Sequence, residues 1–124
     1  MAGQPLRGMA RLTAAWRNSA AGFRDVWAGE EAFRLECVLF ALSIPLALWL
    51  GETMAARALL IVSGLVVLIV EVLNSAIEAA IDRIGPERHE LSRRAKDAGS
   101  LAVLLSTFVP GIVWTAAVLD WLLG

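Results

Sequence analysis

Hydrophobic residues are concentrated in three long runs, which are separated by short polar connections. The runs predict membrane-spanning helices over residues of about 33–50, 55–84 and 98–123. A helix needs roughly 20 apolar residues to cross the ~30 Å hydrocarbon core of a bilayer, and the second and third runs meet this length. Gly85 and Pro86 end the second run, because neither residue continues a helix well. The pattern therefore predicts an all-α membrane protein.

Residues of about 9–27 have a different pattern and contain no run long enough to span a membrane. Leu12, Trp16, Phe23 and Trp27 fall on one face of a helix, while the arginines point elsewhere. An aromatic face flanked by arginine is typical of a helix that lies in the membrane interface. A soluble amphipathic helix packed on a core is the alternative. We expect an N-terminal interfacial amphipathic helix and three transmembrane helices, in one domain that covers the whole 124-residue chain.

The composition agrees with a membrane protein, since 58% of the residues are hydrophobic. The net charge of −1 gives no global basic field, which argues against nucleic acid as a partner. The single cysteine, Cys37, excludes an intrachain disulfide and a zinc site made of cysteines.

The basic residues are divided between two segments of the chain. Five lie in residues 1–34 and five in residues 83–96, whereas Arg57 borders the first connection and none follows the third span. Because basic residues are enriched in cytoplasmic segments, we expect the N-terminus and the second connection to be cytoplasmic and the C-terminus to be outside.

Four polar residues continue the second span without a break: Glu71, Asn74, Glu78 and Asp82. On a helix with ~100° per residue the three carboxylates fall within roughly 40° of one another, with Asn74 about 60° to one side. An ionisable group at membrane depth costs on the order of 2.5–3.5 kcal/mol, so three of them in a stripe indicate a functional site. For Glu71 and Glu78 the alternative is an interhelical salt bridge. For Asp82 a solvated charge at the helix end is the favoured interpretation.

The stripe has the chemistry of a cation site. Mg²⁺ prefers oxygen ligands and uses one or two carboxylates together with water and phosphate. Glu78, nearer the cytoplasmic end, is the better ligand candidate, and the deeper Glu71 is the candidate general base. Lys96 could supply the counter-charge that a triphosphate needs. Either Glu30 or Glu31 could supply a second metal ligand.

Common phosphate-binding motifs are absent from the sequence. It contains no GxxxxGK[ST] loop, no kinase glycine-rich loop and no HRD-like segment. A phosphotransferase in this chain would therefore be of a type unrelated to the enzymes that use those motifs.

Three segments resemble the small prokaryotic diacylglycerol kinase family, which includes the undecaprenol kinases: EEAFRLE, EVLNSAIEAAIDRIG and HELSRRAKDAGS. The similarity extends from about Arg11 to Ser100. It implies a homotrimeric enzyme of the bacterial inner (cytoplasmic) membrane that uses MgATP to phosphorylate a lipid hydroxyl at the cytoplasmic surface. Because one small chain supplies few residues to line such a site, we expect active sites that are shared between subunits.

The same resemblance implies roles for the residues that match the family's motifs. Glu71 looks like the general base and Asn74 like a polar residue of the active site, while Glu30 and Glu78 look like the magnesium ligands. The ATP-binding residues that it implies are Arg11, Asn18, Glu30, Glu78, Glu87, Arg88, His89, Lys96 and Asp97. The lipid-substrate residues that it implies are Arg11, Trp27, Trp49, Glu71, Ser100 and Trp114.

The chain departs from its relatives in having no tyrosine. Asn18 and Arg88 stand at positions where a close relative can carry an aromatic residue. How adenine is held at these positions is therefore left open by the resemblance.

Taken together, these features predict an enzyme: an ATP-dependent diacylglycerol kinase that makes phosphatidate with the help of Mg²⁺ and a carboxylate base. Undecaprenol kinase is the nearest alternative, although the segment DRIGPERHEL is closer to the diacylglycerol branch. From another class, an ion- or proton-handling membrane subunit is an alternative, since a deep carboxylate such as Glu71 is typical of ion paths. The third alternative is a structural membrane oligomer that catalyses no reaction.

Overall fold

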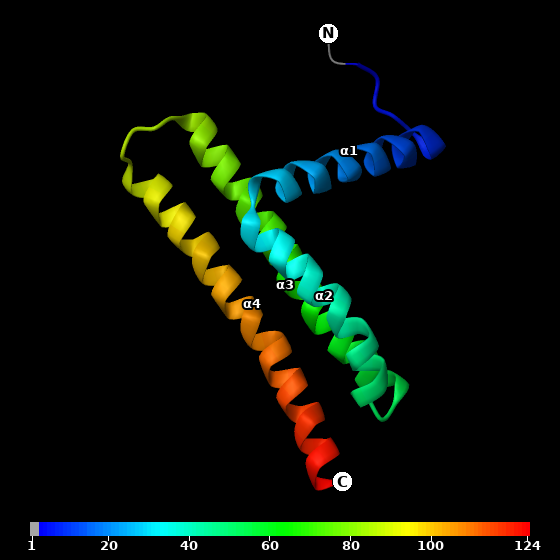
Figure 1. The fold of residues 1–124 in the computed structure, drawn as a ribbon. Helices are drawn as coiled ribbons and strands as arrows, with labels where there is room; N and C mark the ends of the chain where they lie inside the picture. Colours follow the sequence, from blue (N-terminus) through cyan, green and yellow to red (C-terminus); the bar gives the residue numbers. More distant parts are fainter. Residues whose placement is uncertain (1–2) are drawn as a thin grey trace.

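The computed structural model describes residues 3–124, and within them all regular structure is α-helical. The helices are α1 (Gly8–Gly29), α2 (Glu31–Leu50), α3 (Met54–Ile84) and α4 (Glu90–Leu123). The prediction of an all-α protein with one N-terminal helix and three long apolar helices is confirmed (Figure 1).

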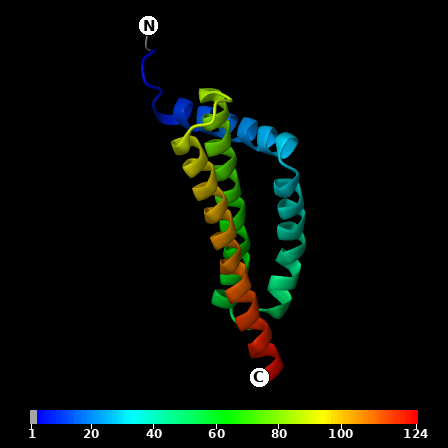
Figure 2. The same cartoon turned by 90° about the vertical axis from the view of Figure 1, so that its left-hand side faces the viewer.

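Helices α2, α3 and α4 run side by side, whereas α1 leaves them at a steep angle (Figures 1 and 2). Helix α3 is the centre of the packing, because it contacts α4 along most of its length and α2 to a smaller extent. Helices α2 and α4 have little direct contact, and α1 packs mainly on the start of α2. The N-terminus and the C-terminus lie at opposite ends of the bundle (Figure 1).

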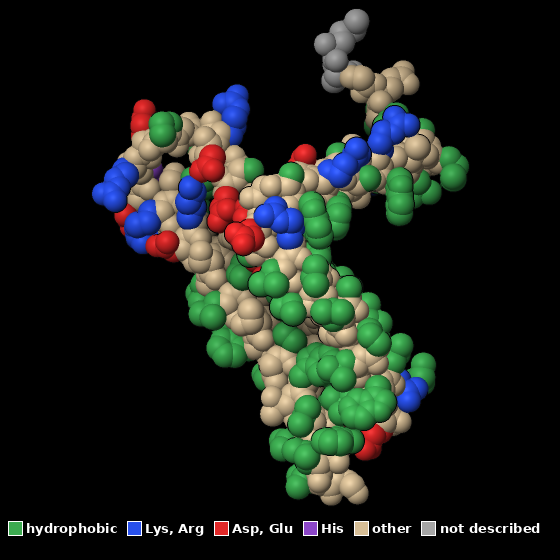
Figure 3. Space-filling view, in the orientation of Figure 1, with side chains coloured by type: hydrophobic (Ala, Val, Ile, Leu, Met, Phe, Trp, Pro, Cys, Tyr) green, Lys and Arg blue, Asp and Glu red, His purple; other side chains and the backbone are tan. Residues whose placement is uncertain are grey.

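Helices α2, α3 and α4 are each long and apolar enough to cross a membrane. Few side chains are buried between them, the hydrophobic ones being Phe33, Ala47, Leu50 and Leu60. Most leucines, isoleucines and valines instead cover the outside of the bundle (Figure 3). An exterior of this kind requires lipid or other apolar surface around it, so the chain is a membrane protein.

Helix α1 has the two faces that its sequence predicts. Leu12, Trp16 and Phe23 are more than half exposed. Figure 3 shows the hydrophobic side chains of α1 on the side toward the apolar bundle and its basic side chains on the opposite side. This arrangement suits a helix that rests on the membrane surface while the bundle crosses the membrane.

A defined elbow at Glu30 joins α1 to α2. Glu30 has an extended backbone (φ −124°, ψ 105°), which interrupts the helix for one residue. The guanidinium of Arg34 donates to the carbonyl oxygen of Trp27 at 2.7 Å. This hydrogen bond gives a partner to one of the carbonyl groups that the last turn of α1 leaves unpaired. The buried ring of Phe33 packs edge-on against Phe23, with ring centroids 5.7 Å apart. These contacts fix the place from which Glu30 projects.

Helix α4 begins well before the apolar segment that predicted the third span. Residues 90–97, which are mostly polar, already form its first turns. His89 Nδ1 accepts a hydrogen bond from the backbone N–H of Leu91, and Arg93 pairs with both Glu90 and Asp97 along the helix. Hydrophobicity marks where a helix can enter the membrane, whereas capping and side-chain pairs decide where it starts.

Candidate functional site

Four carboxylates gather where the elbow and the start of α2 meet the middle of α3. We call Glu30, Glu36, Glu71 and Glu78 the carboxylate cluster. Glu71 is only 6% exposed, and the other three are half-buried. The carboxylates of Glu30, Glu36 and Glu78 are all near enough to that of Glu71 to repel it electrostatically. The sequence predicted the participation of Glu30, Glu71 and Glu78 but missed Glu36.

Among residues 3–124 no cation forms an ion pair with a member of the carboxylate cluster. The ion pairs among residues 3–124 join other groups, namely Arg93 with Glu90 and Asp97, and Lys96 with Asp82. The interhelical salt bridge considered for Glu71 and Glu78 is therefore not formed within the described chain. Uncompensated negative charge at this depth is unfavourable, so the cluster is suited to bind a cation.

The cluster fits a metal that arrives with phosphate better than a metal held by protein alone. Within residues 3–124 there is no group of three or more His, Cys, Asp or Glu side chains that could hold a metal ion. Mg²⁺ does not require one, since it is often bound by one or two carboxylates plus water and substrate phosphates. Glu30 and Glu78 can supply such a pair of oxygen ligands.

Asn74 is tied to the cluster by a hydrogen bond along α3. Its Nδ2 donates to Oε1 of Glu78 at 3.3 Å, one helical turn away. Its Oδ1 is buried and has no hydrogen-bond partner in the described part of the chain. The amide therefore limits the orientation of the Glu78 carboxylate.

Lys96 connects the first turns of α4 to the end of α3. Its Nζ donates to Oδ1 of Asp82 at 2.8 Å. Lys96 precedes the apolar segment of α4, and this hydrogen bond together with the attraction of Asp82 and Glu78 raises the pKa of its ammonium group. The lysine is thus held in its charged form beside the cluster. Asp82, which the sequence favoured as a solvated charge, is the group that orients it.

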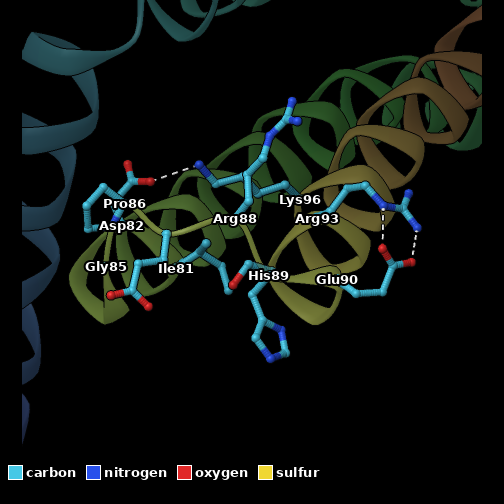
Figure 4. A pocket seen from close by; sticks show the side chains of 11 residues that line it. Ile81, Asp82, Gly85, Pro86, Arg88, His89, Glu90, Arg93 and Lys96 are labelled. Carbon is cyan, nitrogen blue, oxygen red and sulfur yellow. Dashed lines mark hydrogen bonds and ion pairs between the residues drawn. The ribbon is translucent and has the colours of Figure 1, made fainter.

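An open polar hollow of about 590 Å³ lies between the end of α3 and the start of α4 (Figure 4). Of the predicted ATP-binding residues, Glu87, Arg88, His89 and Lys96 line it. The full lining is Ile81, Asp82, Gly85, Pro86, Glu87, Arg88, His89, Glu90, Ser92, Arg93 and Lys96. The charged part of this lining is mixed, since Arg88, Arg93 and Lys96 stand beside three carboxylates. A phosphate chain could draw on these basic side chains there.

A second, mostly apolar hollow of about 290 Å³ lies between α2, α3 and α4. Glu36, whose Oε2 is buried without a hydrogen-bond partner in residues 3–124, contributes a carboxylate to this apolar lining. The lining is Glu36, Leu39, Phe40, Ser43, Gly64, Val67, Leu68, Thr107, Pro110 and Trp114. A polar group in an apolar groove beside Glu71 suits a lipid that presents a hydroxyl. The sequence signal for Glu36 was its position at the start of an apolar run, where a carboxylate is costly.

Several predicted site residues are not brought to the cluster within the single chain. Arg11 and Asn18 are exposed on α1, which extends away from the bundle (Figure 1). Trp49 lies at the opposite end of α2, 6.0 Å from the ring of Trp121. Ser100 is exposed on α4. Trp27, in contrast, lies at the elbow itself, where its ring stacks on that of Phe23. Their assignment to the lipid or nucleotide sites stays a prediction.

Comparisons with known proteins agree on one family. The family model described as "Prokaryotic diacylglycerol kinase" matches residues 17–118. A protein of Escherichia coli K12 named "Diacylglycerol kinase" is 50% identical over 107 residues, which are 86% of this chain and 88% of that protein. Proteins of the same name from Haemophilus influenzae (47% identity; 86% of this chain and 91% of that one) and Pseudomonas aeruginosa (44% identity; 90% and 91%) are also similar.

Proposed function

The chain belongs to the prokaryotic diacylglycerol kinase family, and from this premise we propose that it transfers the γ-phosphate of ATP to the free hydroxyl of diacylglycerol, making phosphatidate. The observation that carries the proposal is the position of an unpaired carboxylate cluster near an open polar hollow whose lining includes Arg88, Arg93 and Lys96. Phosphoryl transfer needs both: a group to accept the proton of the alcohol and positive charge around the phosphates. The matched relatives are named for diacylglycerol, so undecaprenol is not favoured as the acceptor.

Glu71 is the residue best placed to act as the general base. It is the most buried member of the cluster, and the hollow that Glu36 lines opens between the same helices. A diacylglycerol with its acyl chains along that apolar hollow would bring its hydroxyl to the carboxylate end. Glu71 would accept the hydroxyl proton at a carboxylate oxygen as the lipid oxygen attacks the γ-phosphorus. The rest of the chain's contribution is to position the two substrates.

Glu30 and Glu78 are the residues that would hold Mg²⁺. A Mg²⁺ ion held there would supply the positive charge that phosphoryl transfer requires. Asn74 orients Glu78, and the elbow contacts of Arg34 and Phe33 orient Glu30. The two ligands thus come from the elbow and from α3, and the contacts that orient them do not involve the metal.

Lys96 is expected to bind the phosphates of ATP, with Asp82 orienting it. We expect Lys96→Met to lower kcat/KM for MgATP by about 10–100-fold, the usual worth of a hydrogen bond to a charged group. Asp82→Asn should act in the same direction with a smaller effect, because the ammonium group remains. Steady-state kinetics with varied MgATP would measure both. Arg94→Met is the control, since Arg94 neither pairs nor lines the hollow in the described residues; equal losses in Arg94→Met would rule out a specific role for Lys96.

We also propose that the active protein is a homotrimer with shared active sites. The support is that α1 holds Arg11 and Asn18 away from the chain's own cluster, and that much apolar surface is left uncovered. A neighbouring subunit would receive α1 and cover part of the bundle.

Subunit mixing tests this sharing. Arg11→Ala and Glu71→Gln subunits, each expected to be inactive alone, are co-assembled in equal amounts. If Arg11 serves a neighbour's Glu71, roughly a quarter of the sites should contain both intact residues and activity should return. If both residues serve the same chain's site, every site carries one defect. Mixed oligomers that are verified by two affinity tags but stay inactive would thus exclude the shared site.

We place the protein in the bacterial inner (cytoplasmic) membrane with its N-terminus in the cytoplasm and its C-terminus outside. The positive-inside distribution of Lys and Arg supports this orientation, and so does the gathering of charged side chains at the end of the bundle near α1 (Figure 3). The carboxylate cluster and the polar hollow between α3 and α4 then open toward the compartment that contains ATP.

The proposed function is tested by following the γ-phosphate. Purified protein in mixed micelles with diacylglycerol is given γ-labelled ATP and Mg²⁺, and the lipids are separated. We expect label in phosphatidate, no label when the metal is chelated, and none when the lipid is left out. Hydrolysis of ATP without lipid phosphorylation would refute the proposal.

A further inference from the structure

Gly99 is buried at the contact between α3 and α4, close to the carboxylate cluster. It lies inside α4 and does not have a positive φ, so backbone freedom does not explain why a glycine stands there. Alanine would be the better helix former at this position. The explanation is space: a Cβ at residue 99 would overlap Oδ1 of Asn74 and would lie 3.4 Å from its Cγ.

The side chain of Asn74 is held between two neighbours. Its Nδ2 donates to Glu78, and because an ionised carboxylate can only accept, the nitrogen must face Glu78. The oxygen is then turned toward Gly99, where it is buried and accepts no hydrogen bond within residues 3–124. A methyl group at residue 99 would therefore push the amide away from the orientation in which it reaches Glu78.

We propose that Gly99 is a positioning residue for phosphate transfer. By having no side chain, it leaves the space in which Asn74 lies, and Asn74 in turn orients the Glu78 carboxylate. This inference rests on the proposed function, in which Glu78 is a magnesium ligand. Residues that orient metal ligands commonly change metal affinity or activity by ~10–100-fold when they are replaced.

The expected signature is a change in magnesium dependence. Gly99→Ala should raise the Mg²⁺ concentration for half-maximal activity by about tenfold, and Asn74→Ala should do the same. The double variant Gly99→Ala/Asn74→Ala should behave like Asn74→Ala alone, because the added methyl group then occupies space that the amide has left. A general loss of packing would instead lower thermal stability without changing the Mg²⁺ requirement.

Gly111→Ala is the matched control. Gly111 lies in the same helix, and beyond its own helix backbone a Cβ built there meets no atom of residues 3–124 within 4 Å. Wild-type protein and Gly111→Ala should both phosphorylate diacylglycerol with the same Mg²⁺ dependence; if neither does, it is the proposed function that fails.

With both controls active, unaltered Mg²⁺ dependence in Gly99→Ala would overturn the inference about Gly99 alone. So would a double variant that is far weaker than Asn74→Ala. If Gly99→Ala does not assemble, the double variant decides: assembly with the properties of Asn74→Ala supports the proposal, and failure to assemble refutes it.

Discussion

Glu71→Gln is expected to lose ~10²–10⁴-fold in kcat for lipid phosphorylation, the usual contribution of a positioned general base. The amide keeps the shape of the side chain but cannot accept the hydroxyl proton. KM for MgATP should change little, because the proposed role of Glu71 is at the lipid hydroxyl.

The same variant should be at least as stable as the wild type. Glu71 is buried without an ion pair in the described chain, so a neutral side chain removes repulsion from Glu30, Glu36 and Glu78. Thermal unfolding in detergent would measure this. Glu52→Gln, an exposed carboxylate in the connection between α2 and α3, is the control and should keep full activity. Retention of activity by Glu71→Gln to within about tenfold would mean that another group is the base.

The second large effect is expected at the metal ligands. Glu78→Gln removes the negative charge and one carboxylate oxygen of this Mg²⁺ ligand, while the remaining amide oxygen can still accept the Asn74 hydrogen bond. Activity should fall by ~10–100-fold or more. Replacing a residue that only hydrogen-bonds to a metal ligand already costs that much. The Mg²⁺ concentration for half-maximal rate should rise at fixed ATP, and Glu30→Gln should act in the same direction.

Glu31→Gln is the matched control for the metal site. Glu31 is adjacent to Glu30 but is exposed on the first turn of α2. We expect its replacement to leave the Mg²⁺ dependence unchanged. An increased requirement in Glu31→Gln and not in Glu30→Gln would show that the elbow presents the other carboxylate to the metal.

The parts of the site that the sequence predicted are those that one helix determines by itself. Glu71, Asn74 and Glu78 follow from the helical period and from the cost of carboxylates after an apolar run. The three spans follow from their length and hydropathy. Such features depend on local geometry and on the membrane, and not on which helices become neighbours.

The parts that the sequence did not predict depend on helix neighbours. Glu36 belongs to the cluster because α2 packs on α3, and Asp82 orients Lys96 because α4 returns along α3. The sequence shows Gly99 only as a small residue within a helix. Its importance comes from the Asn74 side chain, which belongs to another helix and lies against it. Periodicity shows which face a residue occupies but not what that face meets.

Competition between two acceptors tests the central claim most directly. Equal mole fractions of diacylglycerol and undecaprenol are placed in the same mixed micelles with γ-labelled MgATP, and the two labelled products are separated and counted. We predict label almost wholly in phosphatidate for the wild type and in neither lipid for Glu71→Gln. Label mainly in undecaprenyl phosphate would contradict the assigned acceptor. Absence of label in both lipids, from assembled wild-type protein, would contradict the assignment as a kinase.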